Sequence, residues 1–180
     1  GSLWNKRAIE ERSFARLDHA TVGMGIAVVS RYDDDHEIIA NQVIVTRVIN
    51  NEGLFGYSFS TQVGNNLVTN PEPGSYAENV IAGFVEKARP PTFTVTRFAT
   101  PAAGAPKLTA RILDNDVMTS ILDLTKRAEI GYCRAKTSYY PGNCTDVTLD
   151  PEKPSSLDLE IKLLDNGEFT FKQIREFAGH

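Results

Sequence analysis

Apolar and polar residues alternate most regularly near the end of the chain. Between Leu157 and Leu163 every second residue is apolar, and the residues between them are charged. A period of two is typical of a strand with one buried face. A short polar segment follows, in which Asn166 and Gly167 match the preferred centre of a two-residue type I′ turn. We therefore predict a β-hairpin over residues 157–176.

A type I′ turn at this position would fix which residues of the hairpin face one another. Glu160 would lie directly opposite Gln173, and Asp158 directly opposite Arg175, with their side chains on one face. The same polar face would also carry the next cross-strand pair, Lys162 and Phe171. The opposite face would carry the apolar side chains Leu157, Leu159, Ile161, Leu163 and Ile174.

Upstream patterns predict the other elements. Runs rich in β-branched and aromatic residues predict strands at residues 25–29, 42–49, 55–63 and 92–98. Helical spacing of apolar residues predicts a short amphipathic helix over residues 4–18 and a long helix that begins near Asp114. In the long helix the spaced apolar residues are Val117, Ile121, Leu124 and Ala128. Asp114 or Asn115 can cap its start, and Gly131 falls near its end.

A third helix is predicted to begin near Ser75. Glu78 follows three residues later, and this spacing matches the capping-box pattern, in which the two side chains satisfy the first free N–H groups of a helix. With two or three helices and mainly sequential strands, the sequence predicts an α+β fold, a mainly antiparallel sheet with helices packed on it.

The length of 180 residues suits one domain, with a leading helix in residues 1–20 and an α+β body over residues 21–180. Gly1 and Ser2 resemble a cloning remnant, so we expect the native chain to be longer upstream.

The net charge is −4 and no segment carries a basic stripe, so no nucleic-acid partner is expected. Apolar runs are far shorter than the roughly 18–20 residues that span a bilayer, so no membrane partner is expected either.

The two cysteines, Cys133 and Cys144, leave their redox state open. Two reduced thiols are the favoured interpretation, and a disulfide across the turn-rich segment between them is the alternative. The location of the protein is left open as well, with the cytoplasm favoured. No Cys-x-x-Cys pair or Cys/His cluster predicts a zinc site.

The polar face of the predicted hairpin carries the candidate chemistry. A carboxylate beside an amide oxygen, as at Glu160 and Gln173, can offer hard oxygen ligands to Mg²⁺. Arg175 can hold phosphate oxygens with its forked guanidinium group. The structural alternative is a cross-strand pair of Asp158 and Arg175 that only stabilises an antiparallel sheet, and the pattern by itself leaves both interpretations open.

The hairpin also resembles a known family. Leu-Asp-Leu-Glu-Ile-Lys-Leu, followed by Phe-Lys-Gln-Ile-Arg, is similar to the last hairpin of the ATP-grasp domain in the phosphoenolpyruvate synthase and pyruvate phosphate dikinase family. Members have Asp-φ-Glu-φ, a short turn and then φ-x-Gln-x-Arg, where φ is apolar. Residues 2–8, 24–28, 40–46 and 62–78 resemble further segments of that domain in the same order, although a glycine is more usual than Gln42.

This resemblance implies the C-terminal lobe of an ATP-grasp domain. By position, Glu160 and Gln173 would serve the metal–nucleotide site, and Arg175 would contact phosphate. Asp158 and Glu78 are secondary candidates, and no catalytic residue is assigned. The resemblance implies Mg²⁺ and ATP as cofactors, bound only when both lobes of the domain are present.

The resemblance also implies partners. These are an upstream ATP-grasp lobe and a domain with a phosphorylated histidine, within an ATP-dependent phosphotransferase. The chain has no glycine-rich phosphate loop of its own, so we expect the isolated lobe to be inactive, and enzyme activity is left open. The alternative is a non-catalytic binding or protein-interaction module that is built on the same lobe.

Overall fold

The computed structural model describes residues 6–18, 20, 37–49, 55–83, 91–135 and 156–177. The predicted strand at residues 25–29 lies outside them, as do residues 1–5 and Cys144. The chain divides into two compact units, Gly1–Asp34 and Asp35–His180. In the first unit, helix α1 spans Lys6–Phe14, inside the segment that was predicted to be helical.

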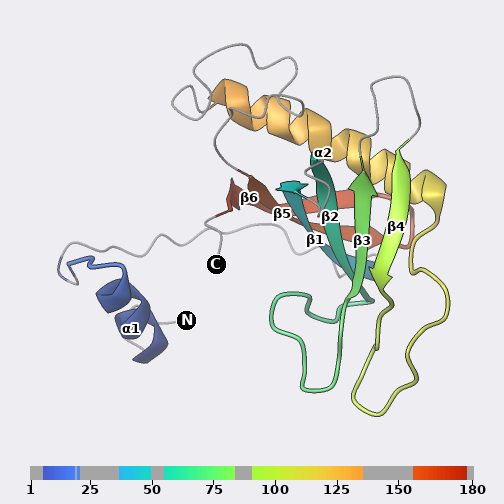
Figure 1. The fold of residues 1–180 in the computed structure, drawn as a ribbon, viewed down its shortest axis with the longest axis horizontal. Coiled ribbons are helices and arrows are strands. Elements are labelled where there is room, and N and C mark those ends of the chain that lie inside the picture. Colours follow the sequence, from blue (N-terminus) through green and yellow to red (C-terminus); the bar gives the residue numbers. More distant parts are fainter. Residues whose placement is uncertain are drawn as a thin grey trace. The chain divides into compact units, whose positions relative to one another are not determined.

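The second unit is built on a six-stranded sheet with the order β4-β3-β2-β1-β5-β6 (Figure 1). All neighbouring strands are antiparallel. The strands are β1 (Ile38–Ile49), β2 (Phe55–Val63), β3 (Glu78–Gly83), β4 (Thr92–Arg97), β5 (Leu157–Leu164) and β6 (Phe169–Glu176). The predicted α+β class and antiparallel sheet are therefore confirmed.

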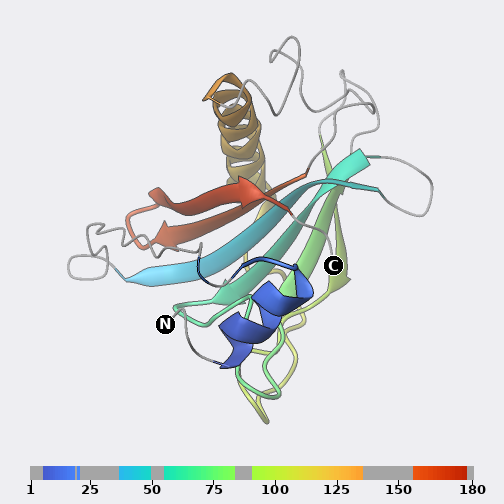
Figure 2. The same cartoon turned by 90° about the vertical axis from the view of Figure 1, so that its left-hand side faces the viewer.

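Helix α2 (Asn115–Ala135) packs on one face of this sheet (Figure 2). Asp114 caps the helix as predicted, since the backbone N–H of Val117 donates to its Oδ1 at 2.9 Å. The buried stripe of α2 is Met118, Ile121, Leu122, Thr125, Glu129 and Cys133. The predicted residues Val117, Leu124 and Ala128 are only partly buried beside this stripe. No helix in the described part of the chain is long and apolar enough to cross a membrane.

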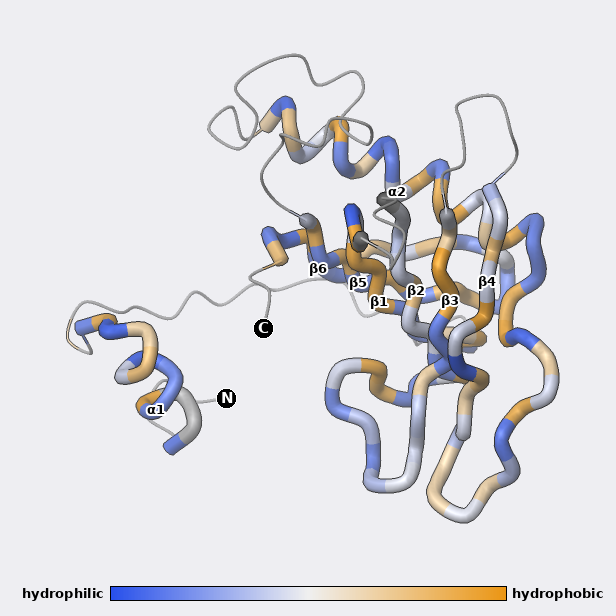
Figure 3. Tube along the Cα trace, in the orientation of Figure 1, coloured by the Kyte–Doolittle hydropathy of each residue, from blue (hydrophilic) through white to orange (hydrophobic). Residues whose placement is uncertain are grey.

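The apolar core lies between α2 and the central strands, where Figure 3 shows the hydrophobic residues of the sheet concentrated. Ile44, Phe59, Val80 and Leu159 come from four adjacent strands, and each is fully buried. The complete burial of such side chains contributes roughly 1.5–3 kcal/mol each to the free energy of folding. The core therefore fixes the apolar face of β5, and with it the direction of the polar face.

A buried polar cluster joins α2 to the sheet. A bulge in β1 between Val45 and Val48 leaves two residues opposite Tyr57, and one of them, Arg47, has a positive φ of 57°. The fully buried Glu129 carboxylate of α2 accepts a hydrogen bond from the Tyr57 hydroxyl, and Arg47 Nε lies 3.4 Å from its Oε1. Burial raises the pKa of Glu129, and the Tyr57 hydrogen bond and the Arg47 charge oppose this effect.

The helix predicted to begin near Ser75 is wrong, because the following residues form strand β3. The segment after Glu78 is rich in apolar and β-branched residues, and it pairs with β2 on one side and β4 on the other. The Ser75 hydroxyl accepts a hydrogen bond from Gln62 Nε2 at 2.8 Å and donates to the Pro101 carbonyl at 3.2 Å. Tertiary pairing therefore overrides the local capping signal.

The favoured prediction of reduced thiols is also wrong, because Cys133 is disulfide-bonded in the structure. Its sulfur lies in the core at the end of α2, where Cys133 is fully buried. Cys144 is the only other cysteine in the sequence, 144 − 133 = 11 positions away. So short a separation makes closure of the loop inexpensive in entropy.

Candidate functional site

The β5–β6 hairpin carries the candidate site. Glu160 lies directly opposite Gln173 and Asp158 directly opposite Arg175, so both predicted cross-strand pairs are confirmed. The neighbouring residues of β5 belong to the core beneath α2, so these four side chains project from the other face of the sheet. We call this polar face of the hairpin the site face.

The turn that joins the two strands differs from the prediction. The N–H of Gly167 donates to the Leu164 carbonyl at 2.9 Å, and the N–H of Leu164 donates to the Glu168 carbonyl at 3.0 Å. Gly167 has a φ of +81°, whereas Asn166 is not among the residues with positive φ. A type I′ turn needs positive φ at both central residues, so the hairpin has instead a three-residue loop that ends in a glycine bulge.

A second irregularity restores the predicted pairs. Beside the turn, Lys162 lies opposite Thr170 and Ile161 opposite Phe171, one position away from the register of a type I′ turn. A bulge then inserts Lys172 as an extra residue before Gln173. The two one-residue shifts offset each other, and this is why the polar pairs farther from the turn are correct.

The bulge changes which residues share the site face. Phe171 was predicted to lie there beside Lys162, and this prediction is wrong, since Phe171 packs against the core. Ile174 also packs against the core, so the two residues between them, Lys172 and Gln173, are both exposed on the outer side. Lys172 therefore joins the site face as a residue that the regular alternation did not predict.

Asp158 holds Arg175 in place. Both Nε and Nη2 of Arg175 donate to Asp158 Oδ2, at 2.9 and 2.7 Å, and Nη2 lies 3.9 Å from Glu160 Oε1. The hydrogen bond with Asp158 raises the pKa of Arg175, so the guanidinium stays charged. The Arg175 side chain is still 50 % exposed. It can therefore offer its remaining N–H groups to an anion.

Asp158 is nearly buried, with only 9 % of its side chain exposed. Its Oδ1 has no hydrogen-bond partner among the described residues. A buried carboxylate oxygen without a partner is costly, so this atom is a candidate acceptor for a group that binds at the site.

Glu160 and Gln173 have the chemistry for a magnesium ion that is shared with phosphates. Glu160 is 28 % exposed and Gln173 is exposed, so both can reach a ligand from solvent. Among the described residues no group of three or more His, Cys, Asp or Glu side chains could hold a metal ion. Mg²⁺ does not require such a cage, because it keeps several waters and often binds through one or two carboxylates and the phosphates of a substrate. The pair therefore offers oxygen ligands of the kind that Mg²⁺ prefers.

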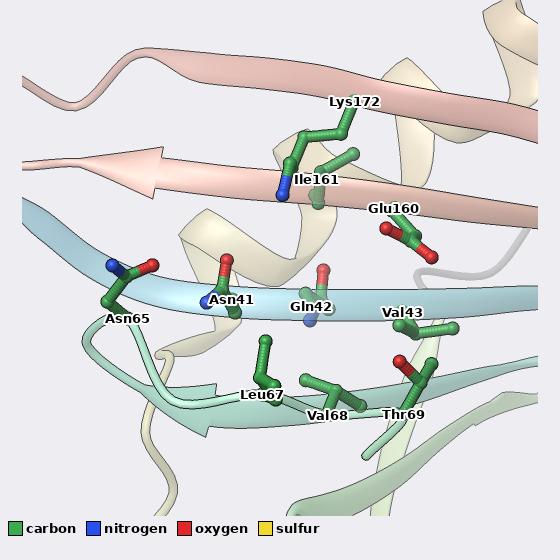
Figure 4. Close-up of a pocket in the computed structure, with 10 residues that line it drawn as sticks. All are labelled: Asn41, Gln42, Val43, Asn65, Leu67, Val68, Thr69, Glu160, Ile161 and Lys172. Atoms are coloured by element: carbon green, nitrogen blue, oxygen red, sulfur yellow. The ribbon is translucent and has the colours of Figure 1, made fainter. Parts of the chain in front are cut away.

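A hollow of about 60 Å³ opens beside Glu160, between the hairpin and the loop that follows β2 (Figure 4). The loop covers this end of β1, since Asn41 Nδ2 donates to the Asn66 carbonyl at 3.1 Å and Lys162 Nζ lies 3.3 Å from Asn65 Oδ1. The lining residues are Asn41, Gln42, Val43, Asn65, Leu67, Val68, Thr69, Glu160, Ile161 and Lys172. The lining thus combines a carboxylate, an ammonium group and polar amides with apolar side chains.

Glu78 lies on the other side of the sheet. It pairs with Thr61, whose hydroxyl accepts a hydrogen bond from Gln42 on the side that faces α2. The fully buried Glu78 carboxylate accepts the Ile112 N–H at 3.1 Å, and burial raises its pKa. The structure therefore does not bring Glu78 together with Glu160.

No protein-family model matches the chain, and a search of characterised proteins gave no significant match.

Proposed function

We propose that this chain is one wall of a magnesium–nucleotide site, the C-terminal lobe of an ATP-grasp phosphotransferase of the phosphoenolpyruvate synthase type. One observation carries the proposal. The hairpin presents a carboxylate beside an amide and a carboxylate beside a guanidinium on the same face, at the positions of the family motif. Sheet stability alone does not require a partly exposed glutamate beside an exposed glutamine.

In this proposal the cationic residue binds phosphate, and the residues with free oxygens bind the metal ion. Arg175 binds phosphate oxygens, and Asp158 orients the guanidinium for this contact. Glu160 and Gln173 offer oxygens to Mg²⁺, which neutralises charge that develops on a transferring phosphoryl group. The chain itself contributes binding and orientation in this account.

The isolated chain is expected to bind nucleotide weakly. Arg175 is half exposed, and the high dielectric of water weakens each charged contact at such a position. An upstream lobe would cover the site face and supply further cationic groups. We therefore expect phosphoryl transfer only when that lobe and the phosphohistidine domain are joined to the chain.

Calorimetric titration with Mg·ATP tests the proposal. The 180-residue chain is compared with the same chain extended upstream in its own reading frame by roughly 150 residues, about one domain. We expect tight binding only for the extended chain, weakened at least about tenfold by Glu160→Ala and by Arg175→Ala. The same lack of binding in both chains would contradict the proposal.

The disulfide at Cys133 favours a second candidate, the non-catalytic binding module. Disulfides persist mainly in oxidising compartments, where an ATP-dependent enzyme would meet little substrate. Thiol blocking during isolation from the native source separates the candidates. A fully reduced Cys133 would remove the support for the module, and a fully oxidised Cys133 in a chain that binds no nucleotide would favour it.

A further inference from the structure

Lys172 lies at a position that a regular alternation along β6 does not predict. The bulge in β6 places it beside Gln173, so that two residues share the position opposite Glu160. Figure 4 shows its side chain running from β6 across Ile161 toward β1, above the hollow. The fold therefore adds a cation to a site face on which Arg175 is already a phosphate-binding candidate.

The hydrogen bonds around the hollow define which groups remain for a ligand. Asn65 uses its Oδ1 to accept from Lys162, which leaves its amide donors. Asn41 uses Nδ2 to donate to the Asn66 carbonyl. The donors that can face a ligand thus include the Lys172 ammonium, the Asn65 amide and the Thr69 hydroxyl, and this set suits anionic oxygens.

The negative charge of Glu160 restricts which anion can bind in the hollow. Its carboxylate lines the same hollow, so a phosphate group there would be repelled unless a divalent cation lay between them. The hollow therefore suits a phosphate that binds together with Mg²⁺. Val43, Leu67 and Val68 form the apolar part of the lining.

We infer that Lys172 is a specificity-determining residue, which binds a second phosphate group of a magnesium nucleotide while Arg175 binds the first. This inference rests on the proposed nucleotide site and extends it. The two residues lie three positions apart on one strand, roughly 10 Å along the backbone, and their long side chains can converge on neighbouring phosphates of one chain. A nucleoside monophosphate reaches only one of the two cations. The site therefore selects di- and triphosphates.

The test compares the affinities of the chain for nucleotides with one, two and three phosphate groups. Dissociation constants for Mg·ATP, Mg·ADP and AMP are measured for the wild-type chain and for Lys172→Met and Lys172→Arg, each in the 180-residue and the extended forms. We expect Lys172→Met to weaken ATP and ADP binding about tenfold and AMP binding less than about twofold, while Lys172→Arg keeps most of the affinity. Without Mg²⁺ the effect on ATP should disappear.

Lys107→Met is the matched control, because Lys107 is an exposed lysine in the loop before α2. Both lysines are exposed, so neither substitution should unfold the protein. If Lys172→Met changes no affinity, or weakens all three nucleotides equally, the inference is wrong while the proposed function stands. If neither form of the wild-type chain binds a nucleotide, both fail together.

Discussion

Gly167 shows how one residue sets the geometry of the hairpin. Its φ of +81° is in the left-handed region, which costs a residue with a side chain roughly 1–2 kcal/mol. We expect Gly167→Ala to lower the free energy of unfolding by about that amount in urea denaturation. A methyl group at Gly167 meets no atom within 4 Å, so the cost is one of backbone conformation alone.

Gly131 provides the control for that experiment. It lies within α2, and an added methyl group there also meets nothing within 4 Å. Because alanine is a better helix former than glycine, Gly131→Ala should raise stability by about 0.5–1 kcal/mol. If both substitutions changed stability in the same direction, the left-handed assignment at Gly167 would be wrong.

The buried Glu129 predicts a dependence of stability on pH. Its pKa is raised in the folded protein, mainly by burial, so the folded state binds the proton more tightly than the unfolded chain does. That contribution is fully present below the unfolded pKa of about 4.5 and is lost as the pH rises through the folded pKa. The stability of Glu129→Gln relative to the wild type should therefore increase from pH 4.5 upward. Urea denaturation at several pH values measures this difference, and a flat or falling difference would contradict the assignment.

At the scale of elements, the bulge in β6 lets us predict how single-residue deletions in this strand change stability. Removal of Lys172 leaves Gln173 opposite Glu160 and Arg175 opposite Asp158, in a regular ladder that matches the register at the turn. This deletion should change the free energy of unfolding by less than about 1 kcal/mol.

Deletion of Ile174 is the contrasting variant. It would move Arg175 to the position opposite Leu159, on the core side of the hairpin. The guanidinium would then lie against apolar residues at a partly buried position, so this deletion should destabilise the protein more than the deletion of Lys172 does. Similar losses for the two deletions would show that the bulge is not where the structure has it.

Sequence patterns predicted the long elements that have clear periodicity. Prediction from the sequence failed where pairing with distant segments determines the secondary structure. The start of α2 follows from a local pattern, a capping aspartate. The polar pairs of the hairpin match the prediction only because the three-residue loop and the bulge at Lys172 offset each other. The strand β3 does not, because Ser75 and Glu78 form a genuine capping pattern that pairing with β2 and β4 overrides. Local propensity cannot report on such partners.

The position of Lys172 could have been predicted from the apolar spacing. Phe169 and Phe171 are two positions apart, but the next apolar residue of β6 is Ile174, three positions farther on. A regular strand keeps a period of two, so this gap signals an extra residue between Phe171 and Ile174. The turn type was the misleading signal, because Asn-Gly also occurs in loops with one left-handed residue.

At the scale of the whole molecule, the disulfide at Cys133 should stabilise the fold. A cross-link over so short a loop contributes about 2–3 kcal/mol in the chain-entropy model. We expect a reducing agent to lower the free energy of unfolding by about that amount, and Cys133→Ala to be insensitive to the reductant. Thiol titration of the unreduced, unfolded protein should find no free thiol. Two reactive thiols there would contradict the bond.

In the whole molecule, the two faces of the sheet have different roles. One face carries the buried Glu78 and packs on α2, which contributes the buried Glu129, and both carboxylates serve the fold. The other face carries the nearly buried Asp158, the partly exposed Glu160 and the half-exposed Arg175. Substitutions of Glu160 and Arg175 should therefore change ligand binding more than stability.

Paramagnetic broadening of nuclear magnetic resonance signals tests the magnesium–nucleotide site most directly. Mn²⁺ replaces Mg²⁺, and ATP is added to the isotope-labelled chain in its upstream-extended form. We expect the broadening to centre on Glu160 and Gln173, to extend to Lys172 and Arg175, and to be lost in Glu160→Ala. Broadening that centres elsewhere, or that persists unchanged in Glu160→Ala, would contradict the assignment of this hairpin as the wall of a metal–nucleotide site.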